Sequence, residues 1–326
     1  MVLVTGGAGY IGSHVNKLLN ESGYETIVVD NLIHGHAEAV KWGRLEVVDL
    51  ANIEELRSLF DKYRFETVFH FAAYAYVGES VNEPAKYYRN NVSNTINLLD
   101  VMREYNSTRI IFSSTCATYG IPQSVPIKED APQNPINPYG WTKLMMEQIL
   151  RDYNEAYRID YLCLRYFNAA GADPDVEIGE KHEPETHLIP LVLDAAADES
   201  KSINVYGSDY PTNDGSCIRD YIHVVDLAKA HVQAMEYLAK GNKSSCINLG
   251  NGAGVSVFEI IDAAKRVTGK DIDVKISPRR PGDPPELVGS AELAEKLLGW
   301  KPQFTDIDTI IRHAWLWHQS LSNNKT

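Results

Sequence analysis

The first half of the chain alternates short apolar runs with longer stretches that have helical spacing. The apolar runs, rich in branched residues, are Val2–Val4, Ile27–Val29, Leu45–Val48, Thr67–Phe71, Ile110–Phe112 and Tyr161–Leu164. The stretches that repeat apolar side chains at helical intervals are 11–20, 53–63, 85–105 and 139–157. Apolar strands that alternate with helices are typical of a parallel sheet covered on both faces. We therefore expect an α/β fold with a doubly wound parallel sheet and right-handed crossovers.

The pattern changes after Phe167. Residues 168–186 are rich in Gly, Pro, Asp and Glu without periodicity, which predicts a loop. Beyond it, the pattern predicts helices at 188–197, 225–238, 257–268, 291–298 and 307–317, with strands at 203–206, 246–249 and 272–276. We therefore expect one domain over residues 1–167 and a smaller α/β lobe over 168–326, some of whose segments return to the first domain. Residues 322–326 should fray.

Composition excludes several classes of protein. The chain has 326 residues, enough for about two domains, with 44% hydrophobic and 23% charged residues. No window resembles a membrane span of roughly 18 apolar residues, and the N-terminus lacks the basic region of a signal peptide. Four scattered cysteines and the Cys/His spacing fit no zinc motif, so we expect no metal and a reduced, cytoplasmic enzyme. The net charge of −13 argues against a nucleic acid or an anionic membrane as partner.

A glycine motif joins the first strand to the first helix. Gly6 permits a tight turn, Gly9 leaves room for a pyrophosphate, and Gly12 lets the helix approach the strand. Asp30 ends the second strand, 18 residues after Gly12, where a carboxylate binds the adenosine ribose. Because that carboxylate repels a 2′-phosphate, we expect a Rossmann domain that binds NAD rather than NADP. A second glycine cluster at 250–254 lacks such an acid and is interpreted as a loop that ends in an N-cap at Ser256.

A candidate catalytic group follows in the same domain. Tyr139 and Lys143 are four residues apart on one face of a predicted helix. An ammonium near a phenol favours the phenolate, so Lys143 should lower the pKa of Tyr139 and make it a base. Thr115 lies just beyond the strand at 110–112, at the edge of the sheet where open α/β folds bind ligands.

Together these motifs resemble the extended short-chain dehydrogenase/reductase family, most closely its UDP-galactose (UDP-glucose) 4-epimerases. The resemblance covers nearly the whole chain. It also includes VDNL at 29–32, HFAAYAYVGES at 70–80, NNV at 90–92, RYFNAAG at 165–171, HLIP at 187–190, CIRDYIHV at 217–224 and RRPGD at 279–283. It implies NAD-dependent C4 epimerisation of a UDP-hexose (UDP-galactose or UDP-glucose) through a transient 4-keto intermediate, with Tyr139 as base.

The resemblance also implies individual site residues. The catalytic residues are Thr115, Tyr139 and Lys143. The cofactor contacts are Gly6, Gly9, Tyr10, Ile11, Gly12, Asp30, Asn31, Leu32, Asp49, Leu50, Phe71, Ala72, Ala73, Asn90, Tyr139, Lys143 and Phe167. The substrate contacts are Thr115, Tyr139, Asn168, His187, Asn204, Val205, Tyr206, Arg219, Arg280 and Asp283. Because relatives pair helices like those at 85–105 and 139–157 into a four-helix bundle, we expect a homodimer.

Three positions depart from the family pattern and leave alternatives open. Thr115 stands where many members have Ser, Ala75 where some have a cofactor-contacting Lys, and Leu287 where others have Tyr or Cys. UDP-xylose/UDP-arabinose or UDP-N-acetylglucosamine is therefore an alternative substrate. A nucleotide-sugar dehydratase is disfavoured because Cys116 and Ala117 replace the acid–base pair that its chemistry needs. A decarboxylase, or a non-catalytic NAD-sensing protein that would not need Tyr139 and Lys143 together, is also less favoured.

Overall fold

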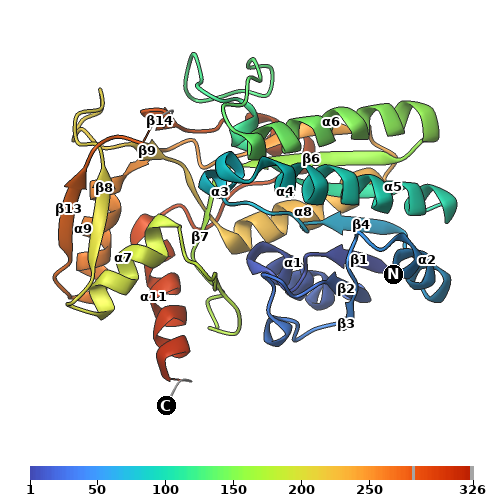
Figure 1. The fold of residues 1–326 in the computed structure, drawn as a ribbon, viewed down its shortest axis with the longest axis horizontal. Helices are drawn as coiled ribbons and strands as arrows, with labels where there is room; N and C mark the ends of the chain where they lie inside the picture. Colours follow the sequence, from blue (N-terminus) through green and yellow to red (C-terminus); the bar gives the residue numbers. More distant parts are fainter. Residues whose placement is uncertain (281–282, 324–326) are drawn as a thin grey trace.

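The computed structural model describes residues 1–280 and 283–323, and its central feature is a parallel sheet of seven strands (Figure 1). The strands are β1 Val2–Thr5, β2 Thr26–Asp30, β3 Arg44–Val47, β4 Thr67–His70, β5 Arg109–Thr115, β6 Asp160–Tyr166 and β11 Ser245–Leu249. Their order is β11-β6-β5-β4-β1-β2-β3, so the chain turns outward in opposite directions from β1 and β4. This confirms the predicted doubly wound sheet, whose ligand crevice lies at the carboxyl ends of these strands.

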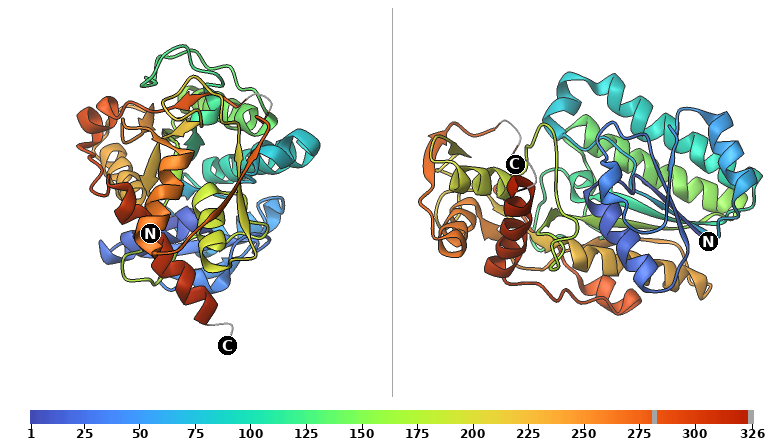
Figure 2. Two further views of the ribbon diagram at one scale, coloured as in Figure 1. Left: turned by 90° about the vertical axis from the view of Figure 1, so that its left-hand side faces the viewer. Right: turned by 90° about the horizontal axis from the view of Figure 1, so that it is seen from below.

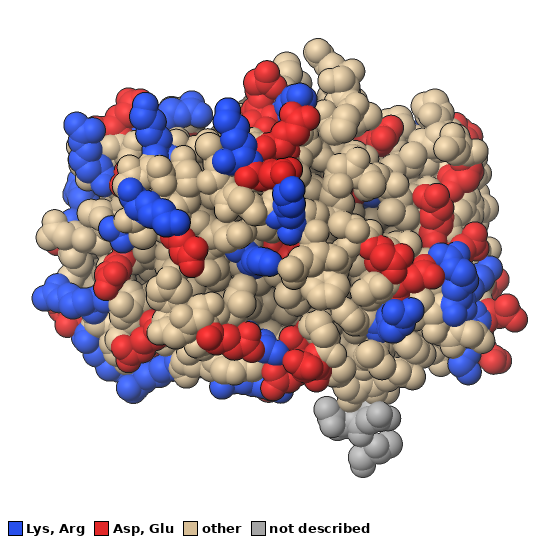
Figure 3. Space-filling view, turned by 180° about the vertical axis from the view of Figure 1, so that it is seen from behind, with Lys and Arg blue, Asp and Glu red and all other residues tan. Residues whose placement is uncertain are grey.

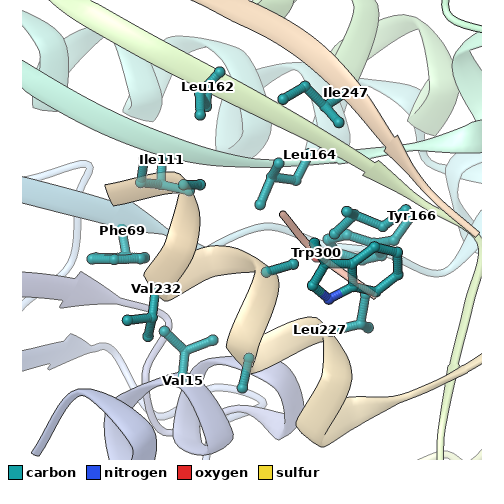
Figure 4. Close-up of a cluster of buried hydrophobic side chains, with 14 of the residues drawn as sticks. Val15, Phe69, Ile111, Leu162, Leu164, Tyr166, Leu227, Val232, Ile247 and Trp300 are labelled. Carbon is teal, nitrogen blue, oxygen red and sulfur yellow. The ribbon is translucent and has the colours of Figure 1, made fainter. Parts of the chain in front are cut away.

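Helices cover both faces of the sheet. One face carries α1 Tyr10–Glu21, α8 Val224–Ala239 and α10 Glu292–Leu298, and the other carries α2 Ile53–Lys62, α5 Asn94–Glu104 and α6 Pro138–Tyr157. Figure 4 shows the core on the first face, where Val15 of α1 and Val232 of α8 meet strand residues. Trp300 is fully buried there and donates from Nε1 to the carbonyl oxygen of Asp226 at 2.8 Å. Apolar strands thus bury side chains on both faces, as their sequences predict.

A smaller lobe lies beside the sheet (Figure 2). Its helices are α7 Leu188–Ala197, α9 Val257–Thr268 and α11 Ile307–Asn323, and its parallel strands are β8 Ser202–Tyr206 and β13 Asp273–Ser277. They share a separate core that includes Ile189, Ile260 and Ile310. The Ser256 side chain caps α9 in a reciprocal capping box with Glu259, which confirms the predicted N-cap.

The two halves of the sequence are interleaved in space. Segment 224–249 comes from the second half, yet α8 packs on α1 and β11 pairs with β6. Short paired segments lie nearer the smaller lobe: β7 Asn168–Ala170, β9 Ile218–Arg219, β10 Tyr221–His223, β12 Val255–Ser256 and β14 Glu286–Leu287. The boundary at residue 167 stays a prediction.

The predicted helix over 85–105 is confirmed, but it contains a π-helical turn that was not predicted. The chain forms α4 Pro84–Tyr88, a π-helical turn at Arg89–Ser93, and then α5. The π turn buries Asn91, whose side chain accepts from the Tyr74 N–H and donates to the Tyr74 carbonyl, both at 2.9 Å. The wider turn therefore fixes the segment that follows β4, a role that apolar periodicity does not reveal.

Other differences concern short elements. Helix α3, Val77–Asn82, was not predicted because it buries only Ser80 and so has no apolar period. The 3₁₀ turns η1 Ala37–Ala39 and η3 Cys116–Thr118 were also missed, and β7 lies inside the segment interpreted as loop. Helix α11 continues through Ser322 to Asn323, although fraying was expected from residue 322, and residues 324–326 lie outside the described residues.

The surface bears charges of both signs. On the face that Figure 3 shows, acidic and basic side chains are interspersed. Within residues 1–280 and 283–323, no helix is both long enough and apolar enough to cross a membrane.

Candidate active site

A cavity of about 1480 Å³ runs along the carboxyl ends of the sheet strands and reaches the smaller lobe. Sites for a single small ligand are typically about 300–1,000 Å³, so this cavity has room for a dinucleotide and a second ligand together. Almost every predicted site residue lines it. The exceptions are Leu32, whose N–H donates to Asp30, and Val205, which is 1% exposed in the core of the smaller lobe. Because alternate residues of β8 face opposite sides, the Val205 side chain points away from the cavity, and its substrate contact stays a prediction.

The glycine loop at one end of the cavity fits a pyrophosphate. A Cβ on Gly12 would lie 2.3 Å from the carbonyl oxygen of Gly6, so α1 can start this close to the turn only without a side chain. Gly6 has φ +70°, which favours glycine. A Cβ on Gly9 would meet only one atom, 3.3 Å away, and would otherwise occupy the cavity. The first N–H groups of α1 have no helical partners and can bind an anion there.

Asp30 stands at the end of β2 beside this loop. Its carboxylate oxygens accept from the N–H groups of Ala8 at 3.1 Å and Leu32 at 2.9 Å. Burial raises the pKa of Asp30, and these two hydrogen bonds oppose the rise. The oriented carboxylate lines the cavity and retains lone pairs for ribose hydroxyls, so the residues present fit an NAD adenosine.

The candidate catalytic residues meet where β5 and α6 approach each other. Asn137 caps α6 by accepting from the Gly140 N–H at 2.8 Å, which starts the helix just before Tyr139. A Cβ on Gly140 would lie 2.6 Å from the carbonyl oxygen of Ala117, so glycine lets α6 lie against the turn after Thr115. Lys143 is 3% exposed and donates to the carbonyl oxygen of Ser113 at 2.8 Å.

The electrostatics of this group differ from the prediction. Burial raises the pKa of Tyr139 far above its usual value, repulsion from Tyr166 adds to this, and hydrogen bonding with Thr115 opposes it only in part. Burial lowers the pKa of Lys143 to about 7. The expectation that Lys143 lowers the pKa of Tyr139 is therefore not met in the protein alone, because burial disfavours the charged form of both groups.

A buried ion pair that the sequence reading missed supports the group. Glu147 and Arg165, 1% and 3% exposed, form two hydrogen bonds of 2.6 and 2.9 Å. Ser114 donates to Glu147 at 2.5 Å, so the pair ties α6 to both β5 and β6. The position of Glu147 one helical turn after Lys143 was the available signal.

The far end of the cavity carries positive side chains. Arg219 donates to Asp283 at 2.5 Å, and Arg280 lies over the Tyr206 ring at 3.9 Å from its centroid. Burial opposes the charge of Arg219, but attraction to Asp283 raises its pKa, so the guanidinium is charged. Such a pair of guanidinium groups suits an anionic ligand. Asn168 and Asn204 also line this end.

A second group, of which only His187 was predicted as a site residue, lies in the cavity wall. Glu180, His182, Glu185 and His187 converge within one loop, with ligand-type atoms all within 4.8 Å of one another. Burial lowers the pKa values of His182 and His187, but the two carboxylates outweigh it and raise them to about 9 and 10. The signal was two histidines and three glutamates within eight residues, in a segment that lacks any period.

The sequence of the chain matches a known protein family. Residues 2–250 match the family model described as "NAD dependent epimerase/dehydratase family". The chain belongs to this family. A UDP-glucose 4-epimerase of Halalkalibacterium halodurans is 51% identical over 318 residues, which cover 98% of this chain and 95% of that protein.

Two solved structures show the same fold. A UDP-glucose 4-epimerase from Brucella ovis in complex with NAD has a TM-score of 0.94 and 53% identity, covering 97% of each chain. One from Bifidobacterium longum in complex with NAD⁺ and UDP has a TM-score of 0.93 and 40% identity, covering 99% of each chain. The predictions of an epimerase-family enzyme and of NAD as cofactor are confirmed.

Proposed function

We propose that the chain is an isomerase that interconverts UDP-glucose and UDP-galactose at C4 with NAD as cofactor. The observation that carries the proposal is one cavity with three consecutive zones. The glycine loop and Asp30 lie at one end, Tyr139 at the centre, and Arg219 and Arg280 at the other end. Relatives named UDP-glucose 4-epimerase, about 50% identical over nearly the whole chain, support this substrate over the pentose and N-acetylhexosamine alternatives.

The chain's own residues bind and orient both ligands. The glycine loop and Asp30 would hold the pyrophosphate and ribose of NAD. When bound, NAD supplies a reversible oxidant for C4 and a positive ring near the phenol. Tyr139 accepts the proton of the sugar 4-hydroxyl once its own hydroxyl is ionised, and Thr115 holds the same sugar oxygen by a hydrogen bond. Lys143 is positioned through the carbonyl of Ser113.

The substrate is anchored away from the reacting carbon. Arg219 and Arg280 would bind the diphosphate, and Asp283 orients the Arg219 guanidinium. An anchor on the diphosphate leaves the sugar free to turn, which C4 epimerisation requires because both faces of C4 must be presented in turn.

The experiment is to follow both UDP-hexoses by chromatography with purified wild type and with Tyr139→Phe. General-base losses are about 10²–10⁴-fold, so the variant should lose at least 100-fold in kcat while its NAD content is unchanged. Tyr157→Phe, at the exposed far end of the same helix, is the matched control and should keep full activity. Near wild-type turnover of Tyr139→Phe would refute the assignment of the base. A wild type that interconverts neither sugar would refute the function.

We also propose that the chain forms a homodimer through the α5 and α6 surface. Trp141 and Met145 are 38% and 40% exposed and lie one turn apart on α6. Light scattering should give twice the 36.5 kDa chain mass, and Met145→Glu should reduce it. A wild-type mass of one chain would contradict the proposal.

The cytoplasmic location of the protein stays a prediction.

A further inference from the structure

We propose that Glu180, His182, Glu185 and His187 form a binding site for one zinc ion in the cavity wall. The four side chains come from a single loop between β7 and α7. Each offers one nitrogen or oxygen, and these atoms all lie within 4.8 Å of one another. The proposal is independent of the epimerase chemistry, because it concerns how this loop is held.

Each of the two histidines lies close to both glutamate carboxylates. Nδ1 of His182 lies 3.2 Å from Glu180 Oε1 and 3.7 Å from Glu185 Oε2. Nδ1 of His187 lies 2.9 Å from Glu180 Oε1 and 2.8 Å from Glu185 Oε1. With zinc–ligand bonds of about 2.0–2.2 Å, the edges of a tetrahedron are about 3.3–3.6 Å. Because one atom from each side chain lies within 4.8 Å of the other three, side-chain movements on the order of 1 Å would place all four around one ion.

Hydrogen bonds account for only part of this convergence. The Nδ1 atom of His182 is buried and makes no hydrogen bond within the described residues, although a carboxylate oxygen lies 3.2 Å away. The Nδ1 atom of His187 is hydrogen-bonded to Glu185 Oε1 at 2.8 Å, which leaves Glu180 Oε1, 2.9 Å from the same nitrogen, as a second close oxygen. A cation among the four atoms would displace the imidazolium protons of His182 and His187 into solvent and bind both nitrogens through the lone pairs so freed.

The surroundings suit ligands that are held in place. Glu185 Oε1 accepts from the backbone N–H groups of Thr186 and His187 at 2.7 and 2.8 Å, which fixes the carboxylate as groups around metal ligands do. The rings of Tyr10 and Tyr76 pack edge-on against His182, with centroids 6.4 and 6.1 Å from its own.

The donor chemistry selects the metal and its role. Two imidazole nitrogens and two carboxylate oxygens suit zinc better than magnesium or calcium, which prefer oxygen alone. Four protein ligands leave no open position, which is typical of structural rather than catalytic zinc. Since His187 also lines the cavity, the ion would fix one wall of the substrate end.

The test measures zinc in tag-free holoprotein, because a histidine tag would itself bind zinc. Protein dialysed against a chelator and then reloaded should hold one zinc per chain by elemental analysis. Co²⁺ in its place should give the strong visible absorption of a tetrahedral site. Glu180→Gln should weaken zinc binding more than the roughly 10–100-fold caused by loss of a group that only orients a ligand. Glu183→Gln, an exposed glutamate of the same loop, should bind zinc like wild type.

NAD content serves as the measure of folding for each variant. If Glu180→Gln loses NAD, His182→Gln provides the second removal of a ligand. Wild-type protein that takes up no zinc and gives no cobalt spectrum would overturn the proposal and leave an ion-pair network. Equal zinc binding by Glu180→Gln, His182→Gln and wild type would also overturn it. Neither result would bear on the epimerase function, which the Tyr139 variant tests.

Discussion

Replacing Glu147 by Gln should destabilise the fold far more than the same change at an exposed ion pair. Glu147 and Arg165 are almost completely buried, and two hydrogen bonds join them. Gln keeps the shape and one acceptor, but it leaves the guanidinium charge without a counter-ion. Arginine side chains stay protonated in proteins, so Arg165 cannot escape the cost by deprotonating once the carboxylate is gone.

The magnitude follows from burial. Breaking a buried pair by removal of one partner costs about 3–5 kcal/mol, because an uncompensated charge stays in the interior. Arg57 and Glu104 form an equally well-aligned pair, with bonds of 2.8 and 2.9 Å, but their side chains are 36% and 35% exposed. Water and salt screen that pair, so Glu104→Gln should hardly change stability.

The assay is urea unfolding at saturating NAD, compared through midpoints at a common slope. Glu147→Gln should lower the unfolding free energy by about 3–5 kcal/mol, and Glu147→Leu with Arg165→Met should recover most of it because no charge stays buried. Equal midpoints for Glu147→Gln and Glu104→Gln would refute the reasoning and show that water reaches Arg165. Since Ser114 also bonds Glu147, kcat should fall with stability.

Three further predictions concern pH and the substrate. Burial lowers the pKa of His70 to about 3, so the unfolded chain binds the extra proton between roughly pH 6.5 and 3, and stability falls on acidification. His70→Gln should make that fall shallower by about 1.4 kcal/mol per pH unit in urea unfolding, and an unchanged slope would contradict the assignment. Arg280→Ala should weaken UDP-sugar binding by about 1.5–3 kcal/mol. The control is Arg279→Ala, which should leave binding unchanged because the Arg279 side chain pairs with Asp209 outside the cavity. Equal KM values for the two variants would show that Arg280 does not bind the substrate. Leu287 lines the cavity, and we expect the wild type to epimerise UDP-N-acetylglucosamine slowly. Leu287→Tyr should abolish this activity and spare that on UDP-galactose. An unchanged ratio of the two activities would show that Leu287 does not set the size limit for the sugar.

The sequence predicts best those elements whose burial pattern is local. Helices α7 and α9 begin and end at the predicted residues, because their apolar spacing records which face is buried. The two-residue strands could not be predicted in the same way. Val255 of β12 pairs with Arg219 of β9, and the stretch between them is long, so only the tertiary fold brings them together. The π-helical turn was missed because its reason is the Asn91 side chain and its bonds to Tyr74.

In the candidate site, too, residues fixed by local backbone geometry could be predicted, and contacts between distant segments could not. Gly6 and Gly12 are required by backbone geometry, so their spacing is visible in the sequence. Thr115 and Lys143 could be placed together because the end of a strand and the start of a helix are readable positions. The partner of Glu147 could not be chosen, since several arginines are available and only the register of β5 with β6 selects Arg165. The functional roles of these site residues stay predictions.

The protonation of Tyr139 and Lys143 is where sequence reasoning is least able to decide. The i, i+4 spacing places an amine near a phenol, and Lys143 Nζ lies 5.9 Å from the Tyr139 ring centroid. Attraction would favour phenolate and ammonium, but burial opposes both charges, and the pKa of Tyr139 stays above that of Lys143, near 7. Transfer of a proton from the phenol to the amine is therefore uphill in the protein alone. Burial thus keeps Tyr139 neutral and inactive as a base until a charged ligand binds beside it. The i, i+4 spacing shows that the two side chains are close together, but it does not show how deeply they are buried.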